Sequence, residues 1–93
     1  MKNNKKSKLR VMNVNQNNLE FINNELKKKK MIVAFIAHWC HHCKELLPTW
    51  YSVIQKLKNK KSNVIILTVP EEFIGQLNCD TNIRGFPTIR VFK

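Results

Sequence analysis

The chain has 93 residues, enough for one small domain. Its hydrophobic fraction of 43% is too high for a disordered chain, and no apolar run is long enough to span a bilayer. The 17 Lys and Arg residues against 6 Asp and Glu give a formal net charge of +11, which would attract acidic proteins, nucleic acid or an anionic surface.

The N-terminal segment is basic. Residues 1–8 are rich in lysine and have no apolar stretch, so we expect them to form a basic flexible tail. No apolar segment of the secretory type follows, so we predict no signal peptide and a cytoplasmic or virion location. The remaining residues, 9–93, are expected to form one folded domain.

The first structured elements are a strand and a helix. Leu9–Val14 alternates apolar and polar side chains, as a strand with one buried face does. Asn17 and Glu20 have the spacing of a capping box at a helix N-terminus. Apolar residues then recur at helical spacing, namely Leu19, Ile22 and Leu26. The cationic run Lys27–Lys30 lies where the helix dipole favours positive charge, and it is expected to close the helix.

The middle of the chain predicts a buried strand followed by a long helix. Met31–Ala37 is a continuous apolar run, typical of a central strand covered on both faces. The helix is expected to begin in the Cys-His-His-Cys segment behind it and to continue to about Lys60. Its inward positions should be Leu46, Trp50, Val53, Ile54 and Leu57. Pro48 should kink this helix, because proline cannot donate to the carbonyl of Lys44.

A second buried strand and a short helix are expected next. Asn63–Val69 is again apolar and β-branched. Pro70, followed by two acidic residues, is typical of a helix start, where proline fits and the dipole favours negative charge. The apolar side of this short helix is expected to consist of Phe73, Ile74 and Leu77.

The chain ends with a turn and a last strand. Gly85-Phe86-Pro87-Thr88 has the composition of a turn. Thr88–Phe92 alternates, and we expect Ile89 and Val91 to point inward and Arg90 outward. The order of strands and helices along the chain predicts an α/β sandwich with a parallel core.

Two cysteines three positions apart carry the chemistry of the chain. A thiolate attacks a disulfide and a thiol barely does, so a nucleophilic cysteine needs a group that stabilises its negative charge. Free N–H groups at the start of the second helix would do this for Cys40. Cys43, one turn further along, would attack the mixed disulfide and release the substrate. We predict a thiol–disulfide oxidoreductase acting on protein disulfides, with no cofactor beyond the redox-active Cys40–Cys43 pair.

Two histidines separate the cysteines. An imidazole of His41 or His42 can donate a hydrogen bond to the Cys40 thiolate or, when protonated, pair with it. Either interaction stabilises the reduced form and makes the disulfide a stronger oxidant. The histidines thus favour oxidation or isomerisation, whereas the missing signal peptide favours a reducing compartment, and the direction of exchange stays open.

The segment Val33–Lys44 resembles the active-site segment of the thioredoxin superfamily, and more closely that of protein disulfide isomerase domains. Those domains have a hydrophobic strand followed by Trp-Cys-x-His-Cys, which residues 39–43 match. Pro48 is placed like the family's helix-kinking proline, and Gly85–Thr88 resembles the family's loop opposite the active site. The resemblance covers roughly residues 10 to 93. It implies a thioredoxin-like domain at 9–93, with a central mixed sheet flanked by helices.

The resemblance also implies roles for particular residues. Pro87 would follow a cis peptide bond and pack beside the two cysteines. The backbone of Phe86, together with Gly85, would be free to pair with an extended substrate strand. The residues expected to tune the redox pair are Trp39, His41 and His42.

Two departures from the family pattern are visible. The family has a buried acid six positions before the first active-site cysteine, where this chain has Ala34. Proton transfer from Cys43 would then use water or a histidine, and turnover would be slow. The family also continues with a further strand and helix, so Thr88–Phe92 would be a sheet edge. We expect self-association, docking on another protein, or a chain that is part of a longer ancestor.

Two alternative functions stay open. One is a Cys/His zinc-binding domain, whose ligands would be Cys40, Cys43, Cys79 and His38. The other is a non-catalytic thioredoxin-like binding module, against which the intact cysteine pair argues. Cys79 on its own is expected to be a semi-buried small apolar residue.

The expected partners follow from the same features. They are protein thiols and disulfides, with an acidic protein and a second copy of the chain as further candidates. We expect no nucleic-acid binding, since the sequence lacks the interleaved aromatics of a single-strand-binding groove. We also expect no bound metal and no membrane span.

Overall fold

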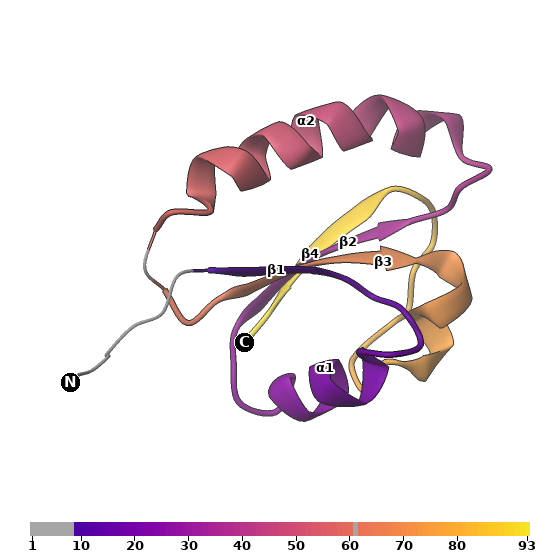
Figure 1. The fold of residues 1–93 in the computed structure, drawn as a ribbon. Coiled ribbons are helices and arrows are strands. Elements are labelled where there is room, and N and C mark those ends of the chain that lie inside the picture. Colours follow the sequence, from indigo (N-terminus) through magenta and orange to yellow (C-terminus); the bar gives the residue numbers. More distant parts are fainter. Residues whose placement is uncertain (1–8, 61) are drawn as a thin grey trace.

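The computed structural model of the protein describes residues 9–60 and 62–93. The tail expected at residues 1–8 lies outside the described residues. A four-stranded sheet forms the middle layer, with the long helix α2 on one face and the short helix α1 on the other (Figure 1). The elements in chain order are β1 (Arg10–Asn13), α1 (Leu19–Glu25), β2 (Met31–Ile36), α2 (His41–Leu57), β3 (Ile65–Pro70), the 3₁₀ helix η1 (Glu71–Gln76) and β4 (Thr88–Phe92).

The sheet is mixed and has the strand order β1-β3-β2-β4. The strands β1 and β2 run parallel to β3, while β4 runs antiparallel to β2. The two central strands, β2 and β3, are the two continuous apolar runs, as expected for strands with both faces covered. The strand β4 lies at the edge of this described sheet, as the sequence predicted. None of the described helices is long and apolar enough to cross a membrane.

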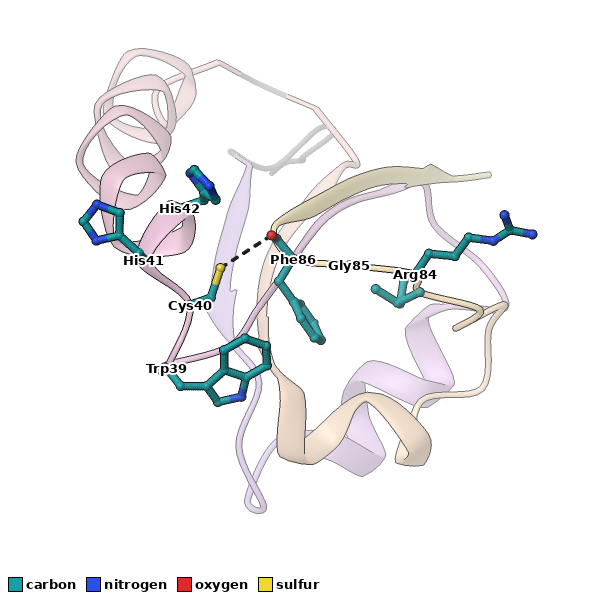
Figure 2. A pocket seen from close by; sticks show the side chains of 8 residues that line it. Trp39, Cys40, His41, His42, Arg84, Gly85 and Phe86 are labelled. Atoms are coloured by element: carbon teal, nitrogen blue, oxygen red, sulfur yellow. Dashed lines mark hydrogen bonds between the residues drawn. The ribbon is translucent and has the colours of Figure 1, made fainter.

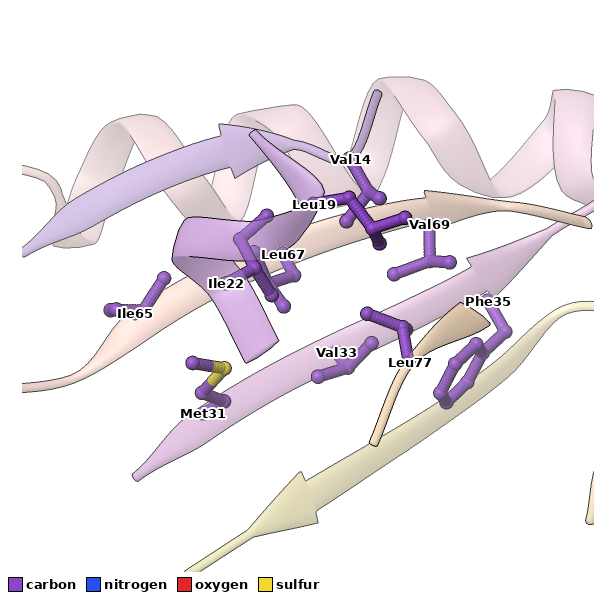
Figure 3. Packing of buried hydrophobic residues seen from close by; sticks show 10 residues of the cluster. All are labelled: Val14, Leu19, Ile22, Met31, Val33, Phe35, Ile65, Leu67, Val69 and Leu77. Carbon is purple, nitrogen blue, oxygen red and sulfur yellow. The ribbon is translucent and has the colours of Figure 1, made fainter. Parts of the chain in front are cut away.

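One half of the core lies between the sheet and α1 (Figure 3). Alternate residues of β2 and β3 point to this face, where Ile22 of α1 is fully buried. The buried members are Val14, Leu19, Ile22, Met31, Val33, Phe35, Ile65, Leu67, Val69 and Leu77. Burial of one such side chain contributes about 1.5–3 kcal/mol, so this cluster is the main support of the sheet.

The other half of the core lies under α2. Trp50 and Ile54 of the helix pack on Ala34 and Ile66 of the sheet. Pro48 lies inside the helix, which continues across it to Leu57, and the kink expected there stays a prediction. Val53 was expected to face inward, but it is 43% exposed, because only one residue of the pair Val53–Ile54 can face the sheet at this turn.

A buried hydrogen bond crosses this second core. The Trp50 indole Nε1–H donates to Thr68 Oγ1 of β3 at 2.9 Å, and both residues are buried. Thr68 pairs with Ala34 on the neighbouring strand. The indole and the hydroxyl thus satisfy each other beside the position where the family resemblance placed an acid.

The start of α1 differs from the predicted capping box. The helix begins at Leu19 with Asn18 at the N-cap position, and that residue caps no helical N–H group. Asn15 instead accepts from the N–H groups of Asn17 and Asn18, and Asn18 accepts from Asn15. Asparagine side chains readily form hydrogen bonds with nearby backbone groups, so residues 15–18 form a hydrogen-bonded turn in place of the capping box.

The end of α1 follows the prediction more closely. The helix ends at Glu25, and the cationic run behind it lies at the negative end of the dipole. The buried Glu25 carboxylate has Lys29 Nζ at 3.3 Å. The helix predicted after Pro70 is a 3₁₀ helix, and none of its residues is buried.

The inward and outward faces of β4 were predicted the wrong way round. Ile89 and Val91 are 48% and 53% exposed, because they lie on the α2 side of the sheet and α2 does not extend over β4. Arg90 lies on the opposite face and is half-buried. Its guanidinium donates to the carbonyls of Asp80 and Asn82 at 3.4 and 2.8 Å. The predicted alternation of the two faces along β4 was right. Arg90 is nevertheless half-buried, because backbone carbonyls on that face accept hydrogen bonds from its guanidinium.

The long segment before β4 is tied down by side chains. Asn23 of α1 donates through Nδ2 to the carbonyl of Gln76 and accepts at Oδ1 from the N–H of Asn78, at 2.9 and 2.8 Å. Together with Arg90, this asparagine anchors residues 76–82, which contain no strand. The position of the following Gly85–Thr88 turn therefore depends on two side-chain anchors.

The buried bond between Trp50 and Thr68 predicts a measurable loss of stability on substitution. Thr68→Val keeps the shape of the side chain but leaves the indole N–H without a partner, which costs about 1–3 kcal/mol. Ser52→Ala, on the exposed side of α2, should change the free energy of unfolding by less than about 0.5 kcal/mol. Urea unfolding followed by tryptophan fluorescence measures both, and equal effects of the two variants would contradict the assignment.

Candidate active site

Cys40 lies in the short connection between β2 and α2, directly before the first residue of the helix. The Cys40 N–H donates to the carbonyl of Ala37 at 3.0 Å, which closes a tight turn after the strand. Cys40 is the N-cap residue of α2 with extended backbone angles, φ −87° and ψ 118°. Its sulfur accepts the N–H of Cys43 at 3.3 Å. A sulfur in the N-cap position thus receives one of the free N–H groups at the positive end of a 17-residue helix.

Cys43 lies behind Cys40 and is nearly inaccessible. Its side chain is 1% exposed, and its sulfur accepts the N–H of Ala37 at 3.5 Å. Burial raises the pKa of the Cys43 thiol, and the neighbouring Cys40 raises it further, while the Ala37 N–H lowers it. Both cysteines are free thiols in this structure. The raised pKa thus favours the protonated thiol at Cys43, which lies behind the sulfur of Cys40.

The Gly85–Thr88 turn lies opposite Cys40. The Phe86–Pro87 peptide bond is cis, as the family resemblance implied. The Cys40 S–H donates to the carbonyl of Phe86 at 3.5 Å, and this contact is the dashed line in Figure 2. The Thr88 hydroxyl donates to the carbonyl of Gly85 at 2.6 Å and closes the turn.

A groove runs between the start of α2 and this turn (Figure 2). On one side the Trp39 ring meets the Phe86 ring edge-on, with 5.9 Å between centroids. Trp39 is 64% exposed, so its outer face is open to a ligand. The groove is lined by Trp39, Cys40, His41, His42, Ile83, Arg84, Gly85 and Phe86. Six of these eight were predicted site residues, while Pro87 and Cys43 do not line it.

Ile83 and Arg84 were missed by the sequence analysis, although their position directly before the turn was an available signal. The Arg84 side chain extends away from the Cys40 sulfur (Figure 2). Arg84 nevertheless lines the groove together with Ile83.

The two histidines pair with an acid, not with the sulfur. His41 Nε2 lies 3.3 Å from Glu45 Oε2, and His42 Nδ1 lies 3.3 Å from Glu45 Oε1. The hydrogen-bond partners of the Cys40 sulfur among the described residues are Cys43 and Phe86. Glu45 was missed as a site residue, although its spacing of three and four residues from the histidines on one helix indicated the contact.

The four residues considered for a zinc site do not come together. Cys79 packs against the α1-side core, where burial raises the pKa of its thiol. His38 lies 4.0 Å from Glu71. Within residues 9–60 and 62–93, no group of three or more His, Cys, Asp or Glu side chains is arranged to hold a metal ion. The zinc alternative therefore has no ligand set in the described part of the chain.

Comparison with known proteins agrees with this geometry. The family model "Thioredoxin" matches residues 9–93. A protein disulfide-isomerase of Oryctolagus cuniculus is 37% identical over 65 residues, covering 70% of this chain and 13% of that protein. Protein disulfide-isomerase 2-3 of Arabidopsis thaliana is 42% identical over 62 residues, covering 67% and 13%. The chain thus spans about an eighth of the length of these curated relatives.

Two solved structures extend the comparison. The first thioredoxin domain of mouse protein disulfide-isomerase A4 aligns with a TM-score of 0.65 and 25% identity, over 85% of this chain and 55% of that one. The J-Trx1 fragment of ERdj5 aligns with the same TM-score at 17% identity, over 89% of this chain and 39% of that one. The second likeness concerns the fold alone.

The burial of Cys43 predicts an order of alkylation. At pH 8, iodoacetamide should modify Cys40 several-fold faster than Cys43, because the reactive species is the thiolate and the pKa of Cys43 is raised above its ordinary value of 9.0. The Cys43 rate should still be rising above pH 9, since its proton is lost only there. Peptide mass spectrometry of timed samples measures both rates. Faster modification of Cys43 at pH 8 would refute this assignment.

Proposed function

The chain belongs to the thioredoxin family, and on that premise we propose that it reduces or forms disulfide bonds in protein substrates, with Cys40 attacking and Cys43 resolving. The observation that carries this proposal is the bond from the Cys43 N–H to the Cys40 sulfur at the start of α2. The same N–H that stabilises a thiolate at Cys40 places the second sulfur one turn behind it. The isomerase relatives support the same class of chemistry.

The proposed reaction has two exchange steps. The Cys40 thiolate attacks one sulfur of a substrate disulfide, so that a Cys40–substrate bond forms and the other substrate sulfur leaves as a thiolate. Cys43 then loses its proton and attacks the Cys40 sulfur, which releases the second substrate thiolate and leaves a Cys40–Cys43 disulfide. Two electrons pass from the chain to the substrate, and oxidation of a substrate dithiol is the same sequence reversed.

The second step is the slower one in this proposal. Burial raises the pKa of Cys43, and the position that the family resemblance assigns to an acid is the buried Ala34. The polar groups of Trp50 and Thr68 beside it are hydrogen-bonded to each other, and neither side chain is basic enough to accept a proton at neutral pH. The acceptor for the Cys43 proton is then water or a histidine.

The groove supports a protein substrate in an extended conformation. Phe86 offers backbone groups beside the Cys40 sulfur, and the exposed face of Trp39 offers an apolar surface. We place Gly85 and Pro87 in this substrate-binding turn and Trp39 among the residues that affect the redox pair. We propose no cofactor beyond the redox-active Cys40–Cys43 pair.

The binding partners and the subcellular location of the chain are proposals as well. An acidic protein fits the net charge of +11, and a second copy fits the exposed edge residues Ile89 and Val91. The cytoplasmic or virion location stays a prediction. The non-catalytic binding module is the alternative that the following experiment separates from the oxidoreductase.

Serine substitutions test the assignment of the two sulfurs. Cys40→Ser should lower insulin reduction by dithiothreitol to the uncatalysed rate, because the attacking sulfur is gone. Cys43→Ser should form a mixed disulfide with a cysteine peptide that persists in a non-reducing gel, because nothing resolves it. Cys79→Ser is the matched control and should keep full activity, since Cys79 packs in the α1-side core.

The outcomes separate the two functions. A binding module would show no insulin reduction in the unmodified protein, and Cys40→Ser would leave its binding unchanged. A trapped complex with Cys40→Ser, and none with Cys43→Ser, would reverse the two roles.

A further inference from the structure

Glu45 holds both histidines of the site at once. Its two carboxylate oxygens each take one ring nitrogen, His41 Nε2 and His42 Nδ1, both at 3.3 Å. The three side chains project from the first turns of α2 and are exposed, with 61% for Glu45 and 78–79% for the histidines. No residue from another element takes part in this arrangement of the described side chains.

The carboxylate dictates which ring nitrogens carry hydrogen. His42 Nδ1 is in hydrogen-bond geometry with Glu45 Oε1, whereas the contact of His41 Nε2 with Oε2 is an ion-pair distance of 3.3 Å. An ionised carboxylate only accepts, so we assign the hydrogen of each neutral ring to the nitrogen that faces it. A neutral imidazole has a single N–H, so the other nitrogen of each ring carries a lone pair. A lone pair cannot donate to a thiolate. While both contacts to Glu45 last, neither neutral ring has a hydrogen to offer the Cys40 sulfur.

We propose that Glu45 is a positioning residue that withholds the imidazole N–H groups of His41 and His42 from Cys40 and thereby weakens the oxidising power of the Cys40–Cys43 couple. This inference rests on the proposed function. Two effects of Glu45 on the stability of the reduced form have the same sign. The acid keeps the donors away from the sulfur, and its negative charge one and a half turns along the helix opposes a thiolate. Both disfavour the reduced form.

Removing the acid should therefore make the couple more oxidising. In glutathione buffers at pH 8, Glu45→Ala should shift the equilibrium constant about two- to fivefold toward the reduced dithiol, the size expected for exposed charge contacts. Glu45→Gln should shift it less, because its amide oxygen still accepts from one ring. The matched control is Glu20→Ala, which removes the same charge from α1 on the other face of the sheet (Figure 1) and should leave the constant unchanged.

A second background tests whether the histidines transmit the effect. In a His41→Ala/His42→Ala protein, adding Glu45→Ala should give a clearly smaller shift than in the unmodified protein, since only the direct charge effect is left. An equal shift in both backgrounds would overturn the proposal. So would no shift in Glu45→Ala, or a shift of the same size in Glu20→Ala.

A measurement on the rings is independent of redox activity. Nitrogen-15 chemical shifts at pH 8 should show hydrogen on Nε2 of His41 and on Nδ1 of His42, and Glu45→Ala should abolish the preference for Nδ1 at His42. Unchanged ring nitrogens would overturn the positioning role. If the Cys40–Cys43 pair does not interconvert between dithiol and disulfide in any buffer, the proposed function fails, and the nitrogen shifts still report on Glu45 itself.

Discussion

The hydrogen bond from the Cys43 N–H to the Cys40 sulfur is the contact around which the site is arranged. It forms because β2 ends inside the protein and the chain turns at once into α2, so that the side chain of Cys40 occupies the N-cap position. A serine or asparagine oxygen ordinarily fills this position. With sulfur there, the capping group is also the nucleophile, and the chemistry and the stability of the helix start share one interaction. The apolar layers on both faces of the sheet hold β2 and α2 in that relation.

Much of this arrangement could be predicted from the sequence, because the features concerned are periodic or close in sequence. The continuous apolar runs identified β2 and β3, since such runs are buried on both faces of a sheet. The Cys40–Cys43 spacing placed both sulfurs on the first turn of a helix. The resemblance to the thioredoxin family brought the distant Gly85–Thr88 turn to the same groove, which local patterns alone cannot do.

The features that were missed depend on partners far away in the chain or on competing contacts. Arg90 was expected outside because a charge is usually solvated, but two backbone carbonyls of a distant loop receive its guanidinium. Asn17 was expected to cap α1, but four clustered asparagine and glutamine residues offered a turn of their own. The histidines were expected to interact with the sulfur, but their ring nitrogens contact a nearby carboxylate instead. In each case the local sequence pattern identified a polar side chain that makes contacts, but the structure gives those contacts to a partner other than the one expected.

The anchoring of residues 76–82 by Asn23 and Arg90 has a consequence for which substitutions this chain tolerates. Neither side chain lines the groove, yet both bind the segment that leads into the turn carrying Phe86. An unbiased selection for loss of activity should thus recover substitutions at both positions among folded, soluble clones, on the side of the sheet remote from the thiols. Distance from the sulfur is a poor guide to mutational tolerance in this molecule.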